Sequence, residues 1–232
     1  MKTRLPLLLL ALLALLTSCA VTESLTLDGT GGSSSADVHV EPFFVDVLSD
    51  FAEFLPDENT NIMDSSIDGF VSELARKGAV DDPSYTKTGE NDYLIVFSYG
   101  SLAQFSEAYR LEDQSLLSQK EHSFSFYLDI DNYGELKSLV SFLRDPNFEV
   151  YGPEYNQGMS EEDYLDMIYF LLGEEGPDAI RNGLVTIILE TPGRVTKTVN
   201  AEKTGENAVK ASFPLIDLLL LNEPISFSVE WD

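Results

Sequence analysis

A basic and apolar leader opens the chain and limits what can fold behind it. Positive charge from Met1, Lys2 and Arg4 precedes an apolar run from Leu5 to Leu16, which ends in Leu16-Thr17-Ser18-Cys19. A basic start, an apolar core and small residues before a cleavage point are typical of a secretory signal, and the run is shorter than the about 20 residues that a membrane-spanning helix needs. We therefore expect a signal peptide over residues 1–18 and one exported domain over residues 19–232.

Cys19 stands where the cut would fall, and it is the only cysteine of the chain. Because no second cysteine can pair with it, no intramolecular disulfide forms and packing alone must hold the exported domain. The position predicts that Cys19 receives a lipid and does not serve as a redox or metal group. The alternatives are an ordinary cleaved signal followed by an unrelated cysteine and an uncleaved anchor helix.

The sequence Leu16-Thr17-Ser18-Cys19 resembles the lipobox of bacterial lipoproteins. This resemblance implies diacylglyceryl transfer to Cys19, cleavage before it and acylation of the new amino terminus. Two or three acyl chains anchor a protein stably, whereas a single chain holds it reversibly. Ala20, not an aspartate, follows the cysteine, which in a bacterium with two membranes would favour the outer membrane. The expected location is thus the extracytoplasmic side of a cell membrane or outer membrane, and the choice between the two stays open.

The expected exported domain is strongly acidic and rich in apolar side chains. Lys2 and Arg4 leave with the leader, so 12 basic and 40 acidic residues remain and the net charge is −28. Such a field repels phosphate backbones and argues against a nucleic-acid partner. Since 44% of the whole chain is apolar and 11% is aromatic, the acid content indicates a folded domain and not a disordered one.

The pattern of apolar residues predicts an α+β fold. Alternating and β-prone runs predict strands over residues 21–28, 36–40, 93–99, 124–130, 184–190, 208–213 and 225–231, with a flexible small-residue turn over residues 29–35. Helical spacing and caps predict helices over residues 42–55, 64–77, 101–108, 136–143, 160–171 and 178–182. We expect an antiparallel β-sheet with helices packed mainly on one face.

Few residues point to chemistry. His39 and His122 are the only histidines, and no nucleophile elbow, phosphate-binding loop or zinc motif is present. The segment Asp129-Ile130-Asp131-Asn132-Tyr133-Gly134-Glu135 resembles part of a calcium loop but lacks the third ligand before the glycine and the glutamate at position twelve, so a strand-to-helix turn is the better interpretation. We expect no catalytic residues, no metal and no cofactor, and therefore no enzyme.

Two short motifs lie near the ends of the chain. The leader is followed by Leu25-Thr26-Leu27-Asp28-Gly29-Thr30-Gly31, and Glu190-Thr191-Pro192-Gly193-Arg194-Val195 leads to the segment from Ala208 to Pro214. With these motifs, both ends of the chain resemble bacterial envelope lipoproteins of the LppM type. The chain differs in ending at Asp232, where such proteins commonly continue into a membrane helix. The resemblance implies an exported α+β domain without catalytic residues and a role in binding lipid or glycolipid.

The functional hypothesis is a non-enzymatic lipoprotein, anchored through Cys19, that binds a lipid or another apolar ligand. It is motivated by an aromatic segment beside an apolar run, namely Phe43, Phe44, Phe51 and Phe54 with Leu215 to Leu221. The loop from Phe148 to Gly158 is a candidate binding rim, because long loops often carry function. The alternative is a protein-interaction or assembly module of the envelope, and an enzyme ranks last. Ligand, partner and oligomeric state stay open.

Overall fold

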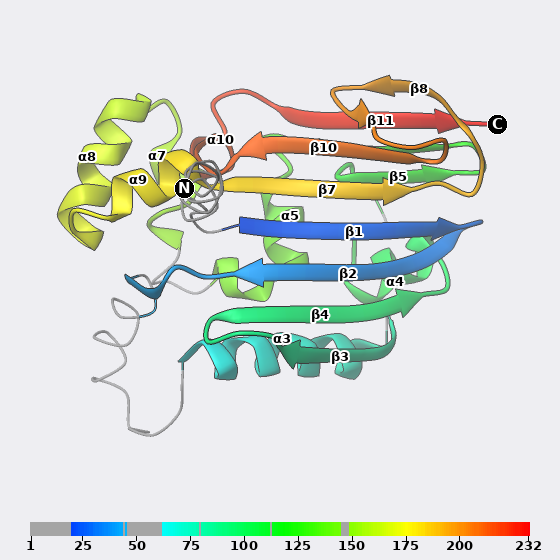
Figure 1. Ribbon diagram of the computed structural model, residues 1–232, viewed down its shortest axis with the longest axis horizontal. Coiled ribbons are helices and arrows are strands. Elements are labelled where there is room, and N and C mark those ends of the chain that lie inside the picture. The colour runs from blue at the N-terminus through cyan, green and yellow to red at the C-terminus, as the bar shows by residue number, and fades with distance from the viewer. Residues whose placement is uncertain (1–19, 44, 46–61, 79, 112, 145–148) are drawn as a thin grey trace, which may run out of the picture.

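The computed structural model describes residues 20–43, 45, 62–78, 80–111, 113–144 and 149–232, which form two β-sheets and several helices (Figure 1). Sheet A has seven strands in the order β3 (Asp81–Lys87), β4 (Asp92–Tyr99), β2 (Gly31–His39), β1 (Ala20–Asp28), β7 (Leu184–Glu190), β10 (Ala208–Pro214) and β9 (Glu202–Lys203). Sheet B has four strands in the order β5 (Leu117–Lys120), β6 (Ser123–Leu128), β11 (Ile225–Trp231) and β8 (Val195–Val199).

Strand pairing is antiparallel throughout the described sheets except between β1 and β7, which run parallel. The expected α+β class is confirmed, although the strands divide into two sheets. The helices are α3 (Ile62–Lys77), α4 (Leu102–Ala108), α5 (Tyr133–Leu139), the 3-10 helix η1 (Ser141–Arg144), α7 (Pro153–Asn156), α8 (Glu161–Leu172), α9 (Gly176–Asn182) and α10 (Leu215–Leu220).

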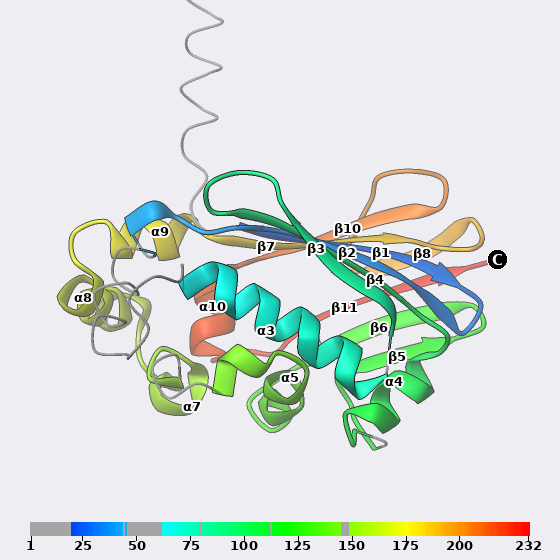
Figure 2. The same ribbon diagram turned by 90° about the horizontal axis from the view of Figure 1, so that it is seen from below.

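Sheet A has an inner face and an outer face with different neighbours. Figure 2 shows α3, α5, α10 and sheet B on one side of sheet A, which is the inner side. The described helices and sheet B leave the other side, the outer face, uncovered, and Figure 1 looks onto it. Side chains alternate between the two faces along each strand, so apolar residues at every second position of these strands build the core.

The main core lies between the two sheets. It joins the inner face of β1, β7 and β10 to the inner face of sheet B, where Phe126 stacks on Phe227 with ring centroids 5.9 Å apart. A second core lies under α3, whose Ile67 packs with Tyr93 and Ile95 of β4. Together these clusters explain why the alternating segments predicted from the sequence are strands: each one has a buried face.

Helix α3, predicted over residues 64–77, has charges and a cap that suit its two ends. Acidic Asp64 lies in its first turn, basic Arg76 and Lys77 lie in its last turn, and Gly78 follows with φ of 64°, so charge and backbone both suit the helix ends. Asp64 also accepts hydrogen bonds from Lys87 Nζ at 2.8 Å and from Tyr93 Oη at 2.6 Å. These two bonds hold the pKa of the Asp64 carboxyl below its usual value, and the bond from Lys87 has the larger effect. They also fix the start of the helix against the sheet.

The prediction of a flexible turn over residues 29–35 is wrong. The turn between β1 and β2 comprises Gly29 and Thr30, and β2 starts at Gly31. A Cβ atom on Gly31 would lie 2.4 Å from the carbonyl oxygen of Tyr99, so only glycine allows β2 to approach the end of β4. The glycine and serine run is therefore a central strand whose small residues permit close packing.

Other differences concern element boundaries. Strands β3, β5, β8 and β9 were not predicted, and the helix expected over residues 136–143 corresponds to α5 and η1. The helix expected over residues 42–55 lies outside the described residues except for Pro42, Phe43 and Val45, which are helical.

Candidate functional site

The start of β1 marks the end of the molecule where an anchor on Cys19 would attach. Cys19 itself lies outside the described residues, but Ala20 is the first residue of β1 and pairs with Leu184, which is two residues after the end of α9. Pro214, at the start of α10, pairs with Leu184 from the other side. Figures 1 and 2 place α8, α9 and α10 at this same end, opposite the C-terminus. We call it the helical end.

Helix α8 exposes apolar side chains at the helical end. Phe170 is 86% exposed, Tyr169 is 53% exposed and Leu171 is 42% exposed. We call these three residues the apolar rim. Large exposed apolar groups in a contiguous run are uncommon on a surface without a partner, and they indicate contact with a membrane, a ligand or another protein.

The buried side of α8 differs from the predicted one. The sequence pattern predicted a buried stripe of Tyr164, Met167, Ile168 and Leu171. The structure buries Tyr164 and Ile168, half-buries Met167 and leaves Leu171 exposed. It buries Leu165 and Leu172 in addition, because these two face α10 and α9. The last turn of α8 therefore exposes three consecutive residues, Tyr169, Phe170 and Leu171.

A compact apolar cluster supports the rim from below. The buried stripe of α8 packs on Ile216 and Leu220 of α10, and Phe43 packs against the same cluster. The structure thus brings Phe43 beside the apolar run from Leu215 to Leu221, as the sequence hypothesis requires. Phe44, Phe51 and Phe54 lie outside the described residues. Ile216, Leu220 and Leu221 are buried, and Leu218 and Leu219 are partly buried and pack against the cores, so most of this run fills the core.

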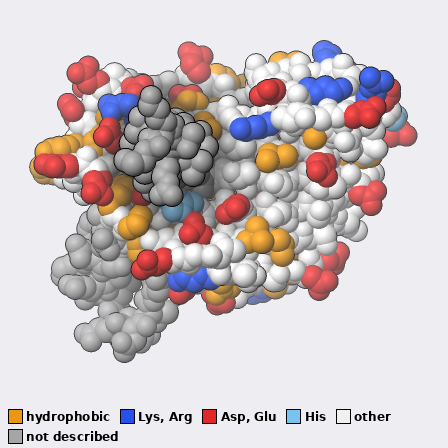
Figure 3. All heavy atoms as spheres, in the orientation of Figure 1, with side chains coloured by type: hydrophobic (Ala, Val, Ile, Leu, Met, Phe, Trp, Pro, Cys, Tyr) orange, Lys and Arg blue, Asp and Glu red, His pale blue; other side chains and the backbone are white. Residues whose placement is uncertain are grey.

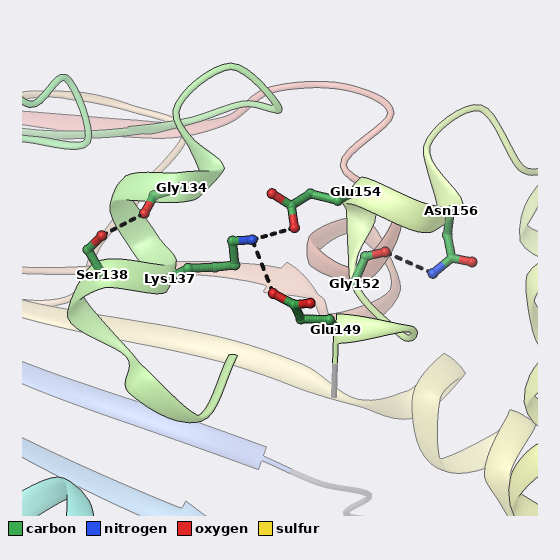
Figure 4. Close-up of polar contacts among 7 residues, drawn as sticks. All are labelled: Gly134, Lys137, Ser138, Glu149, Gly152, Glu154 and Asn156. Atoms are coloured by element: carbon green, nitrogen blue, oxygen red, sulfur yellow. Dashed lines mark hydrogen bonds and ion pairs between the residues drawn. The ribbon is translucent and has the colours of Figure 1, made fainter. Parts of the chain in front are cut away.

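The loop predicted as a binding rim is held by polar contacts on its described residues (Figure 4). Lys137 of α5 forms ion pairs with Glu149 at 3.6 Å and with Glu154 of α7. The hydrogen bond to Glu154, which outweighs the cost of burial, raises the pKa of the Lys137 ammonium. Asn156 is buried and donates to the carbonyl oxygen of Gly152 at 2.8 Å. This segment, from Glu149 to Gly158, is therefore anchored structure beside α8.

Acidic side chains lie at both ends of α8, the helix that carries the rim. Glu161, Glu162 and Asp163 occupy the first turn of α8, where they suit the helix dipole, and Glu174 and Glu175 follow its end. Figure 3 shows apolar and acidic side chains next to one another at this end of the molecule. The electrostatic field here is negative, so an apolar partner of this site would have to be neutral or basic.

Burial also affects an acid in α10. Desolvation, and to a smaller extent the charge of Glu161, raises the pKa of the Asp217 carboxyl. Arg181 of α9 pairs with Asp178 at 3.0 Å and lies 3.9 Å from Glu161.

The two histidines do not meet. His39 Nδ1 lies 2.5 Å from Asp92 on sheet A, whereas His122 precedes β6 of sheet B and lies 3.9 Å from the neighbouring Glu121. Neither pair includes a serine or cysteine nucleophile, so the described residues hold no catalytic triad around a histidine.

The calcium-like segment forms a turn. Asp129 Oδ1 accepts hydrogen bonds from the backbone N–H groups of Asp131 and Asn132, and Glu135 accepts from the backbone of Ser115 and Leu116. Asn132 is buried and donates to the carbonyl oxygen of Tyr127 at 2.9 Å. The side chains of this segment thus stabilise the turn between β6 and α5. Among the described residues, no group of three or more His, Cys, Asp or Glu side chains could hold a metal ion.

A surface hollow of about 460 Å³ lies where α3 ends and β3 begins. Its lining is mainly polar and includes Asp81, Gln104 and Glu107. The other lining residues are Gly78, Val80, Gly100 and Ala108. It therefore does not suit the apolar ligand that the sequence hypothesis invokes.

Within the described part of the chain, no helix is long and apolar enough to cross a membrane. No protein-family model and no curated protein matches the sequence. The solved structure of the folded domain of LppM from Mycobacterium tuberculosis is similar to this chain with a TM-score of 0.43 and 12% sequence identity, over 92% of this chain and 89% of that one. This weak structural similarity assigns neither a ligand nor a location.

Proposed function

We propose that this chain is a lipid-anchored, non-enzymatic protein of a bacterial envelope that engages membrane lipid through its helical end. The observation that carries the proposal is the position of the apolar rim. Tyr169, Phe170 and Leu171 are exposed at the same end at which β1 starts, one residue after Cys19. A lipid on Cys19 would therefore hold the rim beside the bilayer.

The chemistry of the rim suits the membrane interface. Phenylalanine and leucine gain about 1.5–3 kcal/mol each when they leave water completely. Tyrosine keeps its hydroxyl in the wet headgroup layer while its ring is buried. The acidic residues beside the rim oppose binding to anionic headgroups, so we expect it to prefer neutral lipids.

The anchor is tested by the mature amino terminus. Mass spectrometry of the full chain, expressed in a bacterium and purified from its membranes, should show an acylated Cys19 as the first residue. A Cys19→Ala variant should leave the membrane fraction. A mature chain that begins elsewhere and has no acyl groups would contradict the anchor without affecting the rim.

The rim is tested separately in the Cys19→Ala background with neutral phosphatidylcholine vesicles. A triple variant, Tyr169→Ser, Phe170→Ser and Leu171→Ser, should reduce co-sedimentation about tenfold or more, because burial of the three side chains is lost. The control replaces two exposed apolar residues of sheet B by serine, namely Tyr127, which is 41% exposed, and Val199, which is 47% exposed. Equal binding of the rim variant and the parent would refute lipid contact at this site.

The alternative is a protein-interaction module, and the acidic residues around the rim favour a basic partner with an apolar slot. Such a complex would weaken steeply as salt is raised from low to physiological concentration, whereas insertion into neutral vesicles would not. Salt titration of the two kinds of binding therefore separates the alternatives.

A further inference from the structure

The outer face of sheet A carries an array of hydroxyl groups. On the six long strands of sheet A, the register places the outward-facing side chains in three rows that run across the strands. We call these rows the ranks. Between the ends of β1, all three outer residues carry a hydroxyl group, namely Thr22, Ser24 and Thr26. On β2, Ser35 lies opposite Ser24 and Ser33 lies opposite Thr26. The hydroxyl residues of the ranks are Thr22, Ser24, Thr26, Ser33, Ser35, Ser84, Thr86, Ser98, Thr186 and Ser212.

Most of these hydroxyls lack a partner within the described part of the protein. Thr186 bonds to Ser212 at 3.1 Å, and Thr26 donates to Glu190 at 3.5 Å. The other seven make no side-chain hydrogen bond to any described residue, and they are Thr22, Ser24, Ser33, Ser35, Ser84, Thr86 and Ser98. Each can donate one hydrogen bond and accept two.

The shape of the face suits an elongated ligand. In Figure 2 the β3–β4 hairpin and the β9–β10 hairpin both rise on the outer side of sheet A, near opposite ends of the strands. The twisted sheet between them is saddle-shaped. In Figure 3 the part of this face that is in view is mostly white, with scattered charged and apolar side chains. A long, narrow molecule can follow such a surface more closely than a rounded one.

The charge of the chain decides among partners. With a net charge of −26 for the whole chain, nucleic acids, anionic polymers and a second copy of the protein are all repelled. The ranks themselves carry few charges, which are Asp37, Asp81, Glu190 and Lys210. A neutral partner therefore meets the least electrostatic cost on this face.

The hydroxyls decide the chemistry of that neutral partner. Covering hydroxyl groups with an apolar surface costs free energy, because their hydrogen bonds to water are lost and not replaced. The partner must supply donors and acceptors at a similar density. Neighbouring strands are about 4.8 Å apart, close to the length of one sugar ring in an extended glycan chain. A glycan lying across the strands would thus place about one sugar over each strand.

We infer that the outer face of sheet A binds an extended, uncharged polysaccharide chain. This inference does not depend on the lipid anchor or on the apolar rim. The site consists of hydroxyls at the centre of the face, above all Ser24 and Ser35, with Thr22 and Thr26 on either side along β1. Of these four, Thr26 also donates to Glu190 at 3.5 Å.

The test uses calorimetric titration of the full chain in detergent micelles with cellohexaose, N-acetylated chitohexaose and maltohexaose. At least one hexasaccharide should bind, and it should bind about tenfold or more tightly than its own disaccharide, because several sugars contact the face together. A variant with Thr22→Val, Ser24→Ala, Thr26→Val and Ser35→Ala should lose about tenfold or more of this affinity. These changes keep the size and strand preference of each side chain close to the original.

The control is Ser125→Ala with Ser228→Ala, which removes paired serines from the outer face of sheet B. It should bind the hexasaccharide like the parent. Absence of binding to all three hexasaccharides would overturn the inference, as would equal affinity for the disaccharide or an unchanged affinity in the sheet A variant. Self-association of the parent that the sheet A variant abolishes, measured by sedimentation velocity, would assign the face to a second copy instead.

Discussion

Glu23 is a carboxyl on the inner face of β1, and its replacement by glutamine should stabilise the protein at neutral pH. The strand register places Glu23 between Ala36 of β2 and Ile187 of β7, which are apolar. Its described hydrogen-bond partner is Ser34, whose Oγ donates to Oε1 at 2.5 Å. Burial raises the pKa of the Glu23 carboxyl from 4.5 to about 7, and the hydrogen bond from Ser34 offsets this only in part.

The sign of the effect follows from proton binding. Between pH 4.5 and 7 the folded protein keeps the proton on Glu23, whereas the unfolded chain releases it, so unfolding becomes more favourable as pH rises. Below pH 4.5 the carboxyl is neutral in both states and does not lower the free energy of unfolding. Above pH 7 it is charged in both states, and its full destabilising effect on the free energy of unfolding is present. The difference from 4.5 to about 7 corresponds to about 3 kcal/mol in the free energy of unfolding.

The measurement is urea-induced unfolding of the parent and the Glu23→Gln variant at several pH values from 4 to 8. At pH 8 the variant should be more stable by about 3 kcal/mol, and the advantage should vanish near pH 4. Glu162→Gln, on the exposed first turn of α8, makes the same change in net charge and serves as the control. A stability difference that does not change with pH, or a less stable Glu23→Gln variant at pH 8, would refute the reasoning.

Three further substitutions test the packing, each by urea unfolding. Gly31→Ala should destabilise the protein by about 2 kcal/mol or more, because the new Cβ atom would lie 2.4 Å from the backbone of Tyr99. Gly69→Ala, in α3 with open space around it, should instead stabilise the protein by up to about 1 kcal/mol, and equal effects of the two changes would contradict the close approach of β2 to β4. Leu189→Ala, at a fully buried position of β7, should cost about 2–5 kcal/mol, and a cost below about 1 kcal/mol would show that the core between the sheets is not formed. Asn132→Ala should cost about 1–3 kcal/mol and added calcium should not change the stability of the parent; stabilisation by calcium would revive the ion-binding interpretation.

Local sequence patterns predicted the elements that have one buried face. The alternating segments that became β6 and β11 pair directly with each other, with Phe126 opposite Phe227. Helix α8 begins as its capping pattern predicts, because Ser160 Oγ accepts a hydrogen bond from the backbone N–H of Asp163. In each case the signal depends on residues a few positions apart, which is the range over which strand alternation and helix caps act.

Elements without a local signal were missed. Strand β3 is mainly exposed and holds Pro83 at a bulge, so neither alternation nor apolar content marks it. The glycine and serine run of β2 looks like a loop because its small residues are explained only by the strands on both sides. These segments are strands because sheet A supplies hydrogen bonds from neighbours far away in the sequence.

Local patterns in the sequence indicated the α+β class, most strands and helices, the acidity, and the prediction of a lipid on Cys19. Which side chains face outward depends on the packing of the whole fold. Leu171 belongs to the buried stripe that the sequence predicts for α8, and the packing of α8 on α10 leaves it exposed next to Phe170. Ser24 and Ser35 look like ordinary strand serines, and pairing of β1 with β2 joins them on one open face. Local spacing fixes the alternation of each element, whereas exposure depends on what packs against it, which is set by contacts between distant parts of the chain.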